Sequence, residues 1–111
     1  VTRAVRQVAR LQALADQAKV QLLVVLLPDE NQINPALQKL IFPEPEIYDL
    51  DLPQSLLVEQ FAAAGIEVLD LLQSFRADRR CLYQNDTHWT AEGHALVAEQ
   101  IHAAIAERSR R

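Results

Sequence analysis

Asp86, His88 and Trp89 lie within four consecutive residues, just ahead of a helix-like stretch near the end of the chain. A carboxylate two residues before a histidine can accept the imidazole Nδ1 proton, which fixes the tautomer and leaves Nε2 as a base. Thr90 and Glu92 are explained without chemistry, because threonine is a common N-cap and an acid suits the first helical turn. Spacing alone therefore leaves two interpretations open, an acid–base pair or the start of a helix.

The elements that must position this cluster alternate between helices and strands. Apolar residues recur every three or four positions over Thr2–Ala18, which predicts an amphipathic helix. Val20–Leu27 and Ile66–Leu69 are aliphatic runs typical of parallel strands that are covered on both faces. This order predicts an α/β fold with a parallel sheet flanked by helices. Further helices are expected over Pro35 to about Phe42, over Pro53–Ala64 with Gly65 as the C-cap, and over Ala91–Glu107, whose buried stripe comprises Leu96 or Val97, Ile101, Ala104 and Ile105.

Two strands alone make a poor sheet, because their edges and faces lack cover. We expect either a third strand within Leu71–Gln84 or further strands outside the chain. Asp29–Gln32 follows the first strand, and ligands gather at the carboxyl ends of parallel strands. Asn31 in this loop is therefore a candidate substrate-binding residue.

Composition narrows the class of function. The chain has 111 residues, a net charge of −4 and an isoelectric point of about 5.3, and its basic residues are dispersed. This pattern argues against nucleic-acid binding. His94 and His102 are eight residues apart, whereas metal-binding pairs on one helix are three or four apart, so neither a metal site nor another cofactor is expected. The longest apolar run, Leu22–Leu27, is too short for a membrane-spanning segment.

The chain begins at Val1 and contains no methionine, so we expect it to be a piece of something longer. Residues 1–111 are interpreted as a single α/β domain or as the C-terminal fragment of one. The composition does not indicate a cellular compartment.

Three stretches resemble one known family: DTHWTAEGHALVAEQI from Asp86 to Ile101, and upstream LLVVLLPDENQ and AAGIEVLDLLQSF. They resemble the C-terminal part of the SGNH (GDSL-like) hydrolase superfamily, and are most similar to its alginate-type polysaccharide O-acetyltransferase branch. The resemblance implies a flavodoxin-like fold, incomplete in this chain, and a bacterial periplasmic or envelope setting. It also implies His88 as general base, Asp86 as its orienting partner, and Trp89 as a wall of the substrate pocket.

The family's nucleophilic serine has no counterpart here. The only serines are Ser55, Ser74 and Ser109, and none stands on a strand-to-helix turn. We therefore expect the nucleophile outside this chain, in the remaining N-terminal part of the same protein or elsewhere in it, and the chain alone to be inactive. The function so predicted is that of a serine esterase or O-acyltransferase acting on an ester or acetylated carbohydrate. The alternatives are a non-catalytic binding or assembly module of a larger envelope protein, and a small stand-alone α/β domain.

Overall fold

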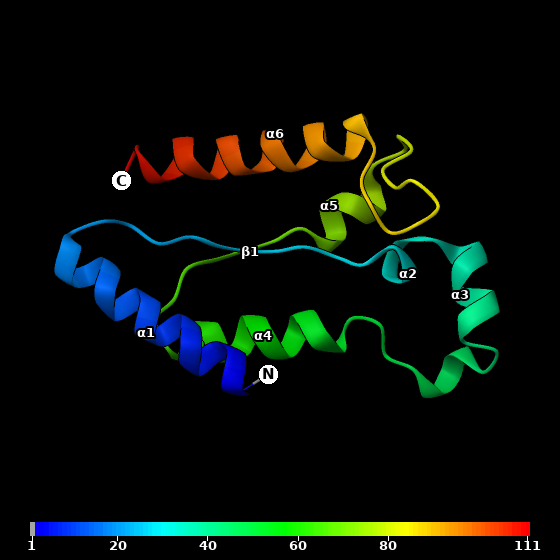
Figure 1. Cartoon of the computed structure of the whole chain (residues 1–111), viewed down its shortest axis with the longest axis horizontal. Coiled ribbons are helices and arrows are strands. Elements are labelled where there is room, and N and C mark those ends of the chain that lie inside the picture. The colour runs from blue at the N-terminus through cyan, green and yellow to red at the C-terminus, as the bar shows by residue number, and fades with distance from the viewer. Residues whose placement is uncertain (1) are drawn as a thin grey trace. The chain divides into compact units, whose positions relative to one another are not determined.

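The computed structural model describes residues 2–111 and divides the chain into two compact units (Figure 1). The first, called here the strand unit, comprises the residues up to 26 together with 49–70. The second, called the loop unit, comprises residues 27–48 and 71–111. The residues with candidate chemistry all belong to the loop unit.

The strand unit contains two helices and a parallel pair of strands. Its elements are α1 (Thr2–Ala18), β1 (Val24–Leu26), α4 (Leu52–Ala63) and β2 (Val68–Asp70). β1 pairs with β2 in parallel, in a register that places Val25 beside Leu69. The predicted α/β class with parallel strands is therefore confirmed, and α1 has the bounds that its apolar periodicity predicts.

The strands are shorter than predicted. Each has three residues, whereas the aliphatic runs predicted strands over Val20–Leu27 and Ile66–Leu69. A strand extends only as far as a partner offers backbone hydrogen bonds, and each strand here has a single partner. Both are half-buried along their length rather than covered on both faces.

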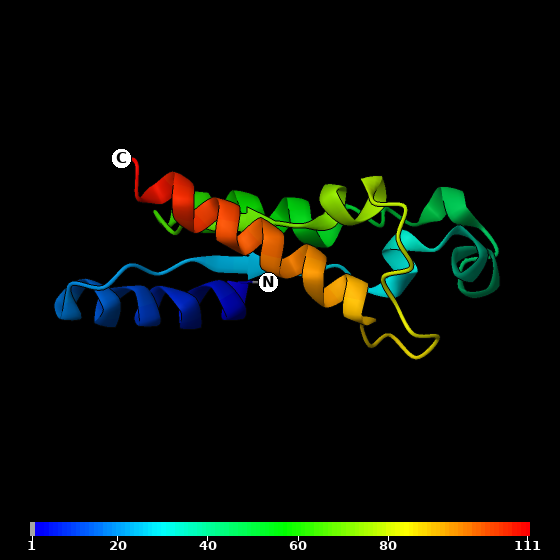
Figure 2. The same cartoon turned by 90° about the horizontal axis from the view of Figure 1, so that it is seen from above.

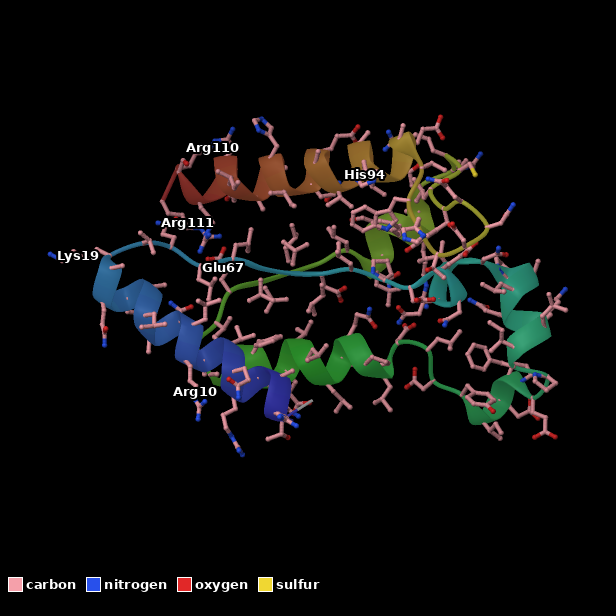
Figure 3. All side chains as sticks on the ribbon, in the orientation of Figure 1. Arg10, Lys19, Glu67, His94, Arg110 and Arg111 are labelled. Carbon is pink, nitrogen blue, oxygen red and sulfur yellow. The ribbon has the colours of Figure 1, made fainter. Side chains whose placement is uncertain are left out.

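The two helices of the strand unit lie against each other (Figure 1), and α4 also contacts β2. α1 buries Ala15 but leaves Leu11 and Leu14 exposed. Arg10 of α1 and Lys19, the residue after its end, extend outward (Figure 3). α4 ends at Ala63 with Ala64 as its C-cap, one residue before the predicted Gly65. Gly65 follows with a φ of +72°, a left-handed conformation that glycine tolerates best and that stops the helix. No helix within residues 2–111 is both long enough and apolar enough to cross a membrane.

The loop unit is built from short helices and one long helix. These are α2 (Glu30–Ile33), α3 (Pro35–Ile41), the 3-10 helix η1 (Pro45–Ile47), α5 (Leu72–Ala77) and α6 (Ala91–Arg108). α3 begins as predicted, with the Asn34 side chain accepting hydrogen bonds from the backbone N–H groups of Ala36 and Leu37. α2 and α5 were not predicted. α5 lies where a third strand was considered, and residues 2–111 form no third strand.

Most of the buried apolar side chains of the loop unit come from α5, α6 and the segment between them. Phe75 is fully buried, with its ring centroid 5.8 Å from that of Tyr83 and 6.2 Å from that of Trp89. Leu96 and Val97 of α6 are buried as predicted. The predicted stripe does not continue to the end of the helix, because Ile105 is 52% exposed.

Candidate active site

The Asp86–Trp89 segment lies in a loop whose two ends are joined by hydrogen bonds. The backbone N–H of Gln84 donates to the carbonyl of His88 at 2.7 Å, and the N–H of Thr90 donates to the carbonyl of Leu82 at 3.0 Å. The side-chain amide of Gln84 also donates to the Trp89 carbonyl at 2.8 Å. The loop is thus closed at its base, and it leads directly into α6 (Figure 2).

Thr90 and Gly93 are explained by the way α6 begins. The Thr90 hydroxyl accepts a hydrogen bond from the Gly93 N–H at 3.1 Å, which confirms the predicted N-cap. Gly93 itself has no room for a side chain, since an added Cβ would lie 2.4 Å from the Leu82 carbonyl oxygen. Glycine therefore lets the first turn of α6 approach the backbone just ahead of the loop.

Asp86 and His88 form the predicted pair. Nδ1 of His88 lies 3.3 Å from Oδ2 of Asp86, while Oδ1 of the same carboxylate accepts the backbone N–H of His88 at 3.2 Å. One carboxylate thus holds both the backbone and the ring of the histidine. An imidazole held through Nδ1 presents Nε2 as the nitrogen that can take up a proton.

The pair borders an open hollow of about 380 Å³. The hollow is lined by Gln84, Asp86, Thr87, His88, Trp89 and His94. The side chain of His88 is 80% exposed and that of Asp86 is 65% exposed. Reactants can therefore reach Nε2 of His88, but the described residues do not shield Asp86 and His88 from water.

Trp89 and His94 form one side of the hollow. Their ring centroids are 5.1 Å apart and the rings meet edge-on, and His94 is labelled on the first turn of α6 in Figure 3. Trp89 is half-buried, and its ring also lies near that of Phe75. It is therefore anchored in the apolar interior and also contributes to the hollow. A substrate-binding role for Trp89 stays a prediction.

Asn31, the other predicted substrate-binding residue, lies on α2 rather than in an open loop. Its backbone N–H donates to the Asp29 carboxylate at 3.1 Å as part of the helix cap. It is not one of the residues that line the hollow. The structure thus brings Asp86, His88 and Trp89 together without Asn31, whose role also stays a prediction.

The sequence alone does not predict a role for two residues near the Asp86–His88 pair, Thr87 and Glu30. Thr87 has a φ of +70°, a conformation that is rare for a β-branched residue. Its backbone N–H donates to Oε2 of Glu30 at 3.3 Å, and Glu30 is only 7% exposed. No local pattern could reveal a contact between residues 57 positions apart. The only available signal was that Glu30 directly follows Asp29, the N-cap of a possible capping box.

An ionic cluster holds the segment that leads into the loop. The Arg80 guanidinium donates to the carboxylates of Asp78, at 2.9 Å, and of Glu99 on α6, at 3.2 Å. The hydrogen bonds from Arg80 lower the pKa of Asp78 below its usual value, and those to Asp78 and Glu99 raise the pKa of Arg80. All three charged groups of the cluster are paired with one another, so we assign it a structural role.

The three serine hydroxyls are all engaged with neighbouring groups. Ser55 donates to the Asp51 carbonyl, Ser109 to the Ile105 carbonyl, and Ser74 to the side chain of Gln100. None of them lines the hollow beside His88. Residues 2–111 also contain no group of three or more His, Cys, Asp or Glu side chains that could hold a metal ion.

The chain is thus an α/β structure with parallel strands, in which a paired aspartate and histidine lie ahead of the final helix. In the comparison with family models, the model described as "SGNH hydrolase-like domain, acetyltransferase AlgX" matches residues 1–111. The chain belongs to this family. Searches among curated proteins and among solved structures found no match.

Proposed function

We propose that this chain supplies the acid–base half of an O-acetyltransferase site, with His88 as general base and acid and Asp86 as its orienting partner. The observation that carries the proposal is the 3.3 Å separation between His88 Nδ1 and Asp86 Oδ2 beside an open hollow. Membership of the AlgX acetyltransferase family supports transfer to a polysaccharide hydroxyl over transfer to water.

In the proposed reaction the nucleophile is a serine from outside these 111 residues. Its Oγ attacks the carbonyl carbon of an acetyl ester while its proton passes to His88 Nε2. Collapse of the tetrahedral intermediate breaks the bond to the leaving alcohol, which takes the proton from Nε2. The acetyl-enzyme then reacts with a sugar hydroxyl, whose proton moves to Nε2 and finally back to the serine.

Asp86 contributes by holding the imidazole and by stabilising its cation. A carboxylate beside Nδ1 keeps the proton on that nitrogen, so that Nε2 has a lone pair aimed at the nucleophile. The same carboxylate loses much of this effect when both groups face water, because solvent screens their attraction. The exposed pair therefore suits a site that is completed when the nucleophile-bearing part covers it.

A non-catalytic binding module is the second candidate. It is favoured by one observation, that each of the three serine hydroxyls is bonded elsewhere and none reaches the hollow. Under this alternative the Asp86–His88 pair would only shape the loop ahead of α6. The two candidates differ in what the whole protein does with an acetyl ester.

The test measures acetyl release from p-nitrophenyl acetate, and its transfer to a polysaccharide, by the natural protein that contains this domain. We expect His88→Ala to lower kcat/KM by about 10³ or more and Asp86→Asn by a comparable factor, because triad members act as a unit. His102→Ala is the matched control, since His102 is an exposed histidine on the same helix as His94 and should not matter.

The 111-residue chain alone is expected to hydrolyse the ester no faster than free imidazole at equal concentration. Faster turnover that is lost in Ser74→Ala would show that the nucleophile lies within the chain. Full activity of the His88→Ala protein would overturn the catalytic proposal. Inactivity of the unaltered protein on acetyl esters and acetylated sugars would favour the binding module.

A further inference from the structure

Glu30 is a buried acid that makes a long-range contact with the loop that contains Asp86 and His88. It is the first residue of α2, soon after β1 ends, and is 7% exposed. Its Oε2 accepts the backbone N–H of Thr87 at 3.3 Å, and the views agree that the loop passes α2 before α6 begins (Figures 1 and 2). A buried carboxylate needs such a donor, since burying a charge without a partner is costly.

The residue that Glu30 contacts is the one that joins the two catalytic candidates. Thr87 connects Asp86 to His88, so rotation about its backbone changes how the carboxylate faces the imidazole. Its φ of +70° is strained for a threonine and persists only where surrounding contacts impose it. The hydrogen bond to Glu30 is a contact of this kind, because it fixes the direction of the Thr87 N–H.

Glu30 is itself held in place. Asp29 caps α2 in a capping box, in which its side chain and that of Gln32 exchange hydrogen bonds with the backbone. Arg76 of α5 donates to the Gln32 carbonyl at 3.2 Å. These bonds keep Glu30 at a fixed position on which the loop can be anchored.

A second contact joins the same two segments. The Tyr83 hydroxyl donates to the Pro28 carbonyl at 2.7 Å, so the segment after β1 holds the base of the loop as well as Thr87. Burial, with smaller contributions from the charges of Asp29 and Glu30, raises the pKa of Tyr83 to about 12.

We propose that Glu30 is a positioning residue, which acts through its hydrogen bond to the Thr87 N–H to keep Asp86 and His88 in register. The effect on catalysis rests on the function proposed above; the effect on the loop does not. A carboxylate is suited to this task because hydrogen bonds to charged acceptors are shorter and stronger than those to neutral ones.

The test compares Glu30→Ala, Glu30→Gln and Glu30→Asp with Glu46→Ala, the removal of an exposed acid from η1 in the same unit. Two readouts use the 111-residue chain: hydrogen exchange of the Thr87 amide, and ¹⁵N shifts of the His88 ring, which report its tautomer. We expect Glu30→Ala to speed Thr87 exchange roughly 10- to 100-fold and to lower the Nδ1–H fraction, which is the effect of losing a hydrogen bond to a charged group. Glu30→Gln keeps an acceptor of the same reach but loses the charge, so it should fall between the unaltered chain and Glu30→Ala, nearer to the unaltered chain.

Glu30→Asp separates positioning from folding. It keeps the charge but shortens the side chain by one methylene, so it should reproduce most of the Glu30→Ala effect while α6 amides exchange as before. In the natural protein, Glu30→Ala should lower kcat about tenfold or more with little change in KM, and Glu30→Gln should restore most of it. Wild-type Thr87 exchange and His88 shifts in both Glu30→Ala and Glu30→Asp would overturn the proposal. If His88→Ala retains activity, the proposed function fails, but the loop readouts still decide the role of Glu30.

Discussion

The two units of this chain hold their elements in different ways. The strand unit relies on apolar contact among a few buried side chains, such as Phe61 and Ile66, and leaves Leu11 and Leu14 exposed on α1. In the loop unit, hydrogen bonds join an exposed loop to α2 and to the start of α6, and ring contacts join it to Phe75 of α5. The candidate site is therefore held by specific contacts around it, although the side chains of Asp86 and His88 are open to solvent.

Within the loop unit, loss of a side chain from the core beneath the loop should cost more stability than loss of one from its half-buried edge. Phe75 is fully buried and packs against Tyr83 and Trp89, so Phe75→Ala should leave a cavity beneath the loop. We expect the free energy of unfolding to fall by about 3–5 kcal/mol. Phe42→Ala is the control, because Phe42 is only half-buried and contacts Tyr48. Urea unfolding of both variants measures the difference, and equal losses would contradict the account of the loop unit.

The two glycines are required for different reasons. Gly93 of the loop unit has no space for a side chain, whereas Gly65 of the strand unit has a positive φ. In Gly93→Ala the new Cβ would meet the Leu82 carbonyl, so backbone must move, at a cost of about 1–3 kcal/mol. Gly65→Ala meets nothing within 4 Å and costs about 1–2 kcal/mol through its positive φ alone.

Nuclear magnetic resonance distinguishes the two glycine effects. Gly93→Ala should shift the signals of His88 and Trp89, whereas Gly65→Ala should leave them unchanged. An unshifted loop in Gly93→Ala would show that the close approach to Leu82 is not required.

Alkaline pH should weaken the loop unit through Tyr83. Burial raises the folded-state pKa of Tyr83 to about 12, above its value near 10 in an unfolded chain, because the buried phenol resists ionisation. The resulting stability is fully present below pH 10 and is lost as pH rises through about 12. Unfolding of the native chain between pH 9 and 12 should therefore be steeper in pH than that of Tyr83→Phe. Parallel pH curves for the two proteins would argue against burial of this hydroxyl.

The smallest effect is expected on the exposed face of α1. Leu14 is 60% exposed, so Leu14→Ala should change the free energy of unfolding by no more than about 0.5 kcal/mol. Ala15, its buried neighbour, offers the contrast, because Ala15→Leu must force a larger side chain into an occupied space. A Leu14→Ala loss comparable to that of Phe75→Ala would erase the difference between the units.

Local signals predicted much of this structure. The periodicity of Thr2–Ala18 defines α1, and the caps at Asn34 and Thr90 define the starts of α3 and α6. The two-residue spacing of Asp86 and His88 also predicts their contact. Each of these features depends on residues that are close in sequence, so their physical basis can be read from the chain.

The missed features fall into two groups. α2 had a readable signal, since Asp29 and Gln32 have the spacing of a capping box, but the polar run was interpreted as a loop. Strand length and the exposure of Ile105 depend instead on which other elements pack against the strand or the helix. An aliphatic run alone does not show this. The contact of Glu30 with Thr87 belongs to the second group as well, because only the folded chain brings the two residues together.

The most direct test of the central claim is the protonation state of the His88 ring in the 111-residue chain. Its ¹⁵N shifts at a pH where the ring is neutral show which nitrogen has the proton. Because Asp86 Oδ2 lies 3.3 Å from Nδ1, we predict an excess of the Nδ1–H tautomer, which Asp86→Asn should reduce while His94 and His102 stay unchanged. The proton on Nε2, or identical His88 shifts in the native chain and in Asp86→Asn, would contradict the assignment of Asp86 as the residue that orients the base.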